Sequence, residues 1–159
     1  MTPIYRQHNS DTDFYRAWTC LSGLTMDFEI DSPQIVVLTG HLDVKHRGLV
    51  SGVIGYAGAL SVHSCPTLAD LPPFPTWSTP MGVRIPGSTN GGNILNRSEH
   101  HYGKIVWSGM VLLEPGAHRI MAHANSHTSI NNNAIDGLAE VLVEGGLGLN
   151  CLIATFHAP

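Results

Sequence analysis

The sequence predicts an all-β domain, a two-sheet antiparallel jelly-roll sandwich of about eight to ten strands. Apolar and polar residues alternate with a period of two along most of the chain, and turn-forming residues interrupt this pattern at short intervals. Only residues 11–18 have a pattern that a helix could adopt. The 159 residues suffice for one domain with a buried core, which we place at residues 18–159 behind an N-terminal arm at residues 1–17.

Three strands and a long loop are predicted in the first half of the chain. Leu24–Ile30 and Ile35–Val44 are expected strands, separated by a turn at Pro33. Leu49–Val62 is the third, and its three glycines predict bulges or a bend, because glycine weakens a strand interior and lets backbones approach. Cys65–Pro80 contains five prolines, which lack amide donors, so an ordered loop is expected there.

The second half contains the clearest pattern, a predicted hairpin. Tyr102–Leu113 alternates as one strand, with Trp107 on one side and Met110 on the other. A tight turn follows at residues 114–116, with proline in a favoured turn position, and His118–Ala124 is the returning strand. The other expected strands are Met81–Ile85, Gly137–Val143 and Leu149–Phe156, and the expected loops are Pro86–Asn93 and Ser126–Asn133.

Composition narrows the classes of partner. Charged residues make up 13% of the chain, against roughly 25% in ordinary soluble domains, and the net charge is −4. Such a chain either hides surface against copies of itself or stays hydrated through uncharged polar side chains, and we favour the first. Its densest cation cluster, Lys45 with Arg47, is too sparse for a nucleic-acid surface. The uncharged stretch 49–68 is too polar for a membrane helix, and residues 1–10 lack the apolar core of a signal peptide.

Cysteine and histidine give no clear metal site. The three cysteines form no CxxC pair, and we expect buried free thiols at Cys20, Cys65 and Cys151. Among ten histidines, His123 and His127 would share one face of a strand but could converge on a metal only if the chain turned between them. One histidine repeated around the symmetry axis of an assembly of copies is another route to a metal site. We favour surface histidines in a chain short of Lys and Glu, and we predict no metal and no cofactor.

Catalytic motifs are absent from the sequence. It contains no GxSxG elbow, no phosphate-binding loop and no His-x-His pair, so we predict no catalytic residues and no enzyme. Asp27 and Glu29 are expected on a solvated strand face. Phe74 and Trp77 lie on the proline-rich loop and are the candidate ligand-binding residues, since aromatic side chains can stack on sugars. The alternative, which we favour, is that this loop folds back and buries both rings.

Three segments resemble the jelly-roll domains related to C1q and tumour necrosis factor. They are the opening WTCLSGLTMDFEIDSPQIVVLTGHLDV, the segment WSGMVLLEPGAHRIMAHANS with its L-x-P-G turn, and the closing LNCLIATFH. Domains of this kind occur in phage fibres and other phage virion proteins, as well as in secreted animal proteins. The resemblance implies a jelly roll and a compact homotrimer. The chain departs from the family in showing no collagen-like or coiled-coil stalk and in its proline-rich loop.

These observations together predict a non-enzymatic, homotrimeric virion structural protein, either a capsid decoration protein or a tail-fibre tip. It would act in particle assembly and surface attachment, be made in the host cytoplasm, and dock on other capsid or tail proteins through residues 1–17. A host surface glycan is a further expected partner, and nucleic acid and membrane insertion are not expected. Alternatives are a carbohydrate- or receptor-binding module and, less favoured, a cupin-like metalloenzyme. The residues expected in the core or at trimer contacts are Trp18, Phe28, Tyr56, Trp107 and Phe156.

Overall fold

A computed structural model describes residues 1–8, 12–13, 18–47, 52–73, 82–96, 100–129, 140–143 and 150–159. Within these ranges the regular structure is β-strand apart from two short 3-10 turns, η1 (Ser22–Leu24) and η2 (Leu68–Asp70), so the predicted all-β class is confirmed. The strands are β1 (Ile4–Gln7), β2 (Thr12–Asp13), β3 (Thr19–Cys20), β4 (Met26–Ile30), β5 (Gln34–Arg47), β6 (Gly52–Cys65), β7 (Val83–Arg84), β8 (Asn90–Asn96), β9 (His100–Leu113), β10 (Gly116–Ser129), β11 (Glu140–Val143) and β12 (Cys151–His157).

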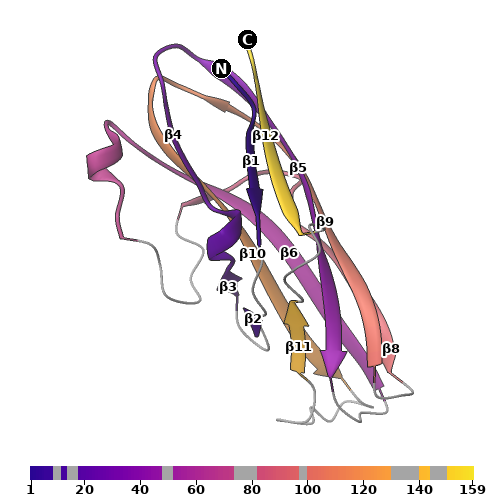
Figure 1. Cartoon of the computed structure of the whole chain (residues 1–159). Helices are drawn as coiled ribbons and strands as arrows, with labels where there is room; N and C mark the ends of the chain where they lie inside the picture. The colour runs from indigo at the N-terminus through magenta and orange to yellow at the C-terminus, as the bar shows by residue number, and fades with distance from the viewer. Residues whose placement is uncertain are drawn as a thin grey trace.

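The strands form two antiparallel sheets with jelly-roll connectivity. In sheet A the order is β1-β12-β5-β9, with β11 continuing beside β5 and β2 beside β11. In sheet B the order is β4-β10-β6-β8, with β3 on the same side of β10 as β4 and β7 on the same side of β6 as β8. Neighbours within each sheet therefore come from distant parts of the chain, as in an eight-strand jelly roll. The long strands β5, β6, β9 and β10 run side by side along the molecule (Figure 1).

The predicted hairpin at the turn 114–116 is wrong. Strand β9 pairs with β5 in sheet A, from Leu113 opposite Gln34 to His100 opposite Arg47. Strand β10 pairs with β4 and β6 in sheet B. The turn therefore carries the chain across the sandwich, and Gly116 supplies a backbone φ of 140° that other residues rarely adopt. Alternation shows that each strand has one buried face, but it does not show which strand is its neighbour.

Other segments also extend further as strands than expected. Asn90–Asn96 is strand β8 instead of a flexible turn, because Gly91 and Gly92 let its backbone lie close to β6. A Cβ on Gly92 would lie only 2.5 Å from Tyr56 Oη. Strand β10 continues to Ser129, into the expected loop, and the two residues of segment 11–18 that have an assigned element form strand β2 instead of a helix. The glycines of β6 form no bulge, since its register runs without interruption from Val53 to Cys65.

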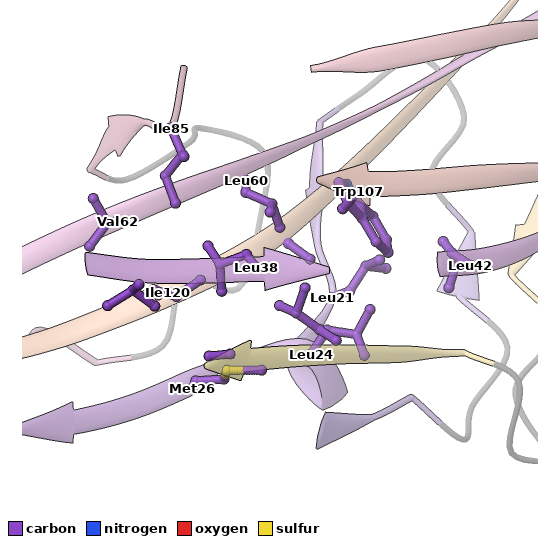
Figure 2. Close-up of a cluster of buried hydrophobic side chains, with 14 of the residues drawn as sticks. Leu21, Leu24, Met26, Leu38, Leu42, Leu60, Val62, Ile85, Trp107 and Ile120 are labelled. Atoms are coloured by element: carbon purple, nitrogen blue, oxygen red, sulfur yellow. The ribbon is translucent and has the colours of Figure 1, made fainter. Parts of the chain in front are cut away.

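The core lies between the two sheets and follows the predicted alternation. Met26, Phe28 and Ile30 of β4 point inward, as do Ile105 and Trp107 of β9. The side chains that meet there are completely or almost completely buried (Figure 2). Further members come from the other long strands and from the turns: Leu21, Leu24, Leu38, Leu42, Leu60, Val62, Ile85 and Ile120.

Both chain ends lie at the same end of the sandwich (Figure 1). Residues 4–7, placed by sequence in an N-terminal arm, form strand β1 and pair with β12 from Ile4 opposite Ala154 to Gln7 opposite Cys151. The domain boundary at residues 17 and 18 stays a prediction. No helix in the described ranges is long and apolar enough to cross a membrane.

Candidate functional site

The outer face of sheet A carries exposed apolar side chains. Because side chains alternate along β9, the residues between its buried positions point away from the core. Val106, Met110 and Leu112 are 54%, 63% and 56% exposed. Met110 and Leu112 lie opposite Val37 and Ile35 of β5, whose side chains are half-buried on the same face. Exposed apolar side chains that gather on one face of a sheet in this way mark interaction sites.

The same face continues across β12 and β1. Ile153 of β12 lies between Thr39 of β5 and Tyr5 of β1, and Tyr5 is 50% exposed. At one end of the face, Lys104 Nζ lies 3.5 Å from Asp43 Oδ1, so these opposite charges partly neutralise one another. We call the surface formed by Tyr5, Ile35, Val37, Val106, Met110, Leu112 and Ile153 the apolar face.

A shallow hollow of about 540 Å³ opens within the apolar face. Val106 and Ile153 line it together with His41 and Cys151. The Cys151 Sγ and His41 Nδ1 atoms are 3.8 Å apart. The sequence gives no hint of this pair, because its members are 110 residues apart and come together only when β12 pairs with β5.

The outer face of sheet B is different, because polar side chains there are buried within the chain. Arg119 is only 9% exposed, and its Nε and Nη2 atoms each donate a hydrogen bond of 2.7 Å to the Asp27 carboxylate. Its Nη1 donates to the carbonyl of Pro72. The Asp27 hydrogen bonds raise the pKa of Arg119 above its usual value. Asp27 is therefore an ion-pair partner, and the described start of the proline-rich loop lies against this face.

Removing the Asp27 charge is expected to destabilise the fold. Asp27→Asn leaves the Arg119 guanidinium buried without a counter-charge, which should lower the free energy of unfolding by about 1.5–3 kcal/mol. Urea unfolding followed by circular dichroism measures the change. The matched control is Glu29→Gln, an exposed position on the same side of β4, where we expect less than about 0.5 kcal/mol. Equal losses in the two variants would contradict a special role for the Asp27–Arg119 pair.

Two histidines of β10 are held by serines of β6. His123 Nε2 lies 2.8 Å from Ser61 Oγ, and His118 Nδ1 lies 2.8 Å from Ser64 Oγ. Burial lowers the pKa of both imidazoles, and the positive charge of Arg84 adds to the effect at His123, whose pKa falls to about 4. Both side chains are at most 3% exposed, so a substrate has little access to them. These contacts indicate buried neutral imidazoles that support the sheet.

The turn that a metal site at His123 and His127 required is absent. Strand β10 runs without interruption through both positions, which places their Cα atoms about 13 Å apart. Burial also raises the pKa of the neighbouring Cys20 thiol to about 11, so this thiol stays protonated at neutral pH. Among the described side chains, no three His, Cys, Asp or Glu residues are grouped to hold a metal.

The aromatic residues that we expected in the core or at trimer contacts are buried or half-buried. Phe28 and Trp107 are in the core, and Phe156 packs edge-on against Phe28 with 5.1 Å between ring centroids. Tyr56 is half-buried against the core. Trp18 is half-buried, and the guanidinium carbon of Arg84 lies 5.1 Å from its ring centroid. The candidate ligand-binding residues Phe74 and Trp77 lie outside the described ranges.

Sequence comparison yields no match, either to a family model or to a curated protein. Among solved structures, a CocE/NonD family hydrolase from Staphylococcus aureus is 10% identical with a TM-score of 0.49, over 99% of this chain and 36% of the hydrolase. The structure of infectious bursal disease virus strain Gt is 10% identical with a TM-score of 0.47, over 98% of this chain and 37% of the viral chain. The structure of T=1 particles derived from the same virus is 12% identical with a TM-score of 0.39, over 96% of this chain and 34% of the viral chain.

The chain thus spans about a third of the length of these structures. All three TM-scores are below 0.5, so these structures support no inference about this chain. Membership of the C1q and tumour necrosis factor family stays a prediction.

Proposed function

We propose that the protein is a non-enzymatic virion structural subunit that assembles with copies of itself through the apolar face. The observation that carries this proposal is the exposure of Val106, Met110 and Leu112 on one face of β9. An isolated chain would leave more than half of each side chain in water, and burying that exposed part contributes about 1–2 kcal/mol for each. Only 13% of residues are charged, which supports a surface hidden in an assembly.

The outer faces of the two sheets differ in exposure, and this difference favours sheet A as the surface that contacts a second copy. On sheet B, Ser61, Met121 and His123 are almost fully buried within a single chain. On sheet A, Met110 and Leu112 are instead 63% and 56% exposed. A second copy is the occupant that we propose for the apolar face, and the resemblance to C1q-like domains supports a homotrimer.

The proposed role also includes attachment to a virus particle. We infer that the trimer acts as a capsid decoration protein or a tail-fibre tip, and that residues 1–17 contact other capsid or tail proteins. Strand β1 supports this, because it holds the segment at the rim of sheet A, where Met1 is 58% exposed. Sugar binding by Phe74 and Trp77 stays a prediction from sequence.

Charge placed on the apolar face is expected to break the assembly. The unmodified protein should have a mass about three times the 17.1 kDa of one chain, and Met110→Glu should yield single chains. A carboxylate buried at an apolar contact loses hydration without gaining a partner. Light scattering coupled to size exclusion measures the mass, and circular dichroism confirms that the variant folds.

The control places the same charge elsewhere. Val83→Glu changes a 74% exposed residue of β7, outside the apolar face, and should keep the trimer mass. A single-chain mass for the unmodified protein, or a trimer that survives Met110→Glu, would overturn the proposal.

A further inference from the structure

An imidazole lies in the hollow of the apolar face, on the surface where we propose that copies of the chain meet. His41 of β5 is half-buried, and its register partners are Val106 of β9 and Cys151 of β12, so these side chains lie next to one another on one face of the sheet. His41, Val106 and Ile153 line the hollow of about 540 Å³. The ring therefore lies beside open space in the single chain, and a second copy that covered this face would enclose it.

The charged groups beside His41 already neutralise one another. On β5, Asp43 is the next side chain on the same face, and its Oδ1 lies 3.5 Å from Nζ of Lys104 on β9. Lys104 also lines the hollow. A protonated imidazole would therefore add a second positive charge to the hollow, while the carboxylate beside it is already engaged by a cation.

The described parts of β12 and β1, on the other side of His41, supply no negative charge in acid. The Cys151 Sγ atom lies 3.8 Å from His41 Nδ1, a thiol–imidazole hydrogen bond. Thiols carry no charge in acid, and their sulfur is a weak acceptor for a protonated ring. On the same face, β12 also carries the exposed His157 and β1 carries Tyr5, and phenols are neutral in acid. An imidazolium enclosed here would therefore find no free counter-charge among these groups.

We propose that His41 makes assembly through the apolar face depend on pH, so that copies of the chain associate at neutral pH and separate in mild acid. This regulation rests on the proposed function, because only a second copy on the apolar face encloses the ring. A neutral imidazole can be enclosed with its thiol hydrogen bond, whereas a protonated one would lose hydration without gaining a partner. Histidine is the side chain that ordinarily changes charge between pH 8 and pH 5. The separated chain therefore binds a proton that the assembly excludes, and acid favours separation.

The association constant, measured by light scattering over a dilution series of the full chain, tests this regulation. Between pH 7.5 and pH 5.5 it should fall by about a hundredfold or more, because each chain of a trimer excludes a proton and each excluded proton contributes up to about tenfold per pH unit. His41→Gln, which cannot gain a charge, should lose most of this dependence. His41→Lys, which carries a charge at both pH values, should be a single chain at both. His157→Gln, which replaces an exposed histidine on the same face of β12, is the control and should keep the dependence.

The result that overturns this role of His41 is an association constant that does not fall in acid, that falls as much in His41→Gln as in the unmodified chain, or that loses its pH dependence in His157→Gln. Assembly of His41→Lys at pH 7.5 would overturn it as well. Circular dichroism at each pH separates dissociation from unfolding. A single-chain mass for the unmodified protein at pH 7.5 would contradict the assembly itself, whereas an assembly with the same constant at both pH values would contradict only the role of His41.

Discussion

Replacing Trp107 with alanine is expected to lower the free energy of unfolding by about 3–5 kcal/mol. Trp107 is completely buried between the sheets, and it is among the largest side chains in the core (Figure 2). The substitution removes its apolar area and leaves a cavity that close-packed neighbours refill only in part. Urea unfolding at one fixed protein concentration measures the loss, because the stability of an assembling protein depends on concentration.

A second substitution, at the neighbouring Gly58, tests whether Trp107 fills the space beside this glycine. A Cβ at Gly58 would overlap Ile105 Cγ2 and lie 2.7 Å from Trp107 Nε1, so Gly58→Ala should cost about 1–3 kcal/mol through overpacking. In the Trp107→Ala background the contact with the indole is gone and the overlap with Ile105 remains, so the cost of Gly58→Ala should fall but not vanish. Val83→Ala, at an exposed position, is the control and should change little. Additive effects of Gly58→Ala and Trp107→Ala would contradict direct contact between the two positions.

Acidification from pH 7 to pH 4 is expected to remove about 3 kcal/mol of stability through His123 alone. The folded protein lowers the pKa of His123 from 6.5 to about 4, first through burial and second through the charge of Arg84. Between these two values the unfolded chain binds a proton that the folded chain excludes. Stability from this residue is therefore complete above about pH 6.5 and is lost as the pH falls toward 4.

The difference between two proteins isolates this effect from other titrating groups. His123→Gln keeps a polar side chain that can reach Ser61 but has no imidazole to protonate. Unfolding free energies measured for both proteins at pH 7, 6, 5 and 4 should converge as the pH falls, because only the unmodified protein loses the contribution of His123. Curves that stay parallel over this range would show that His123 titrates alike in the folded and unfolded chains.

The proposed self-association was predictable from the sequence only in outline. Low charge indicated self-association, and the alternation of Tyr102–Leu113 already had apolar residues on both of its sides, at Trp107 and at Met110. The structure shows which side matters: Trp107 fills the core and Met110 remains in water. That choice depends on which face of β9 the opposite sheet covers, a long-range property that no local pattern contains.

What the sequence determined by itself is the all-β class, the main strands and the inward face of β4. These follow from the period-two alternation, which is local because successive side chains point to opposite faces. Strand partners were decided only by the tertiary structure. The turn 114–116 connects the two sheets and does not close a hairpin within one sheet. Gly58 leaves room for the Trp107 side chain and does not form a bulge. Cys151 contacts His41, which lies 110 residues away in the sequence. Each of these features depends on contacts between segments that are far apart in the chain. Alternation predicts that a strand has a buried face, but it does not predict which strand pairs with it.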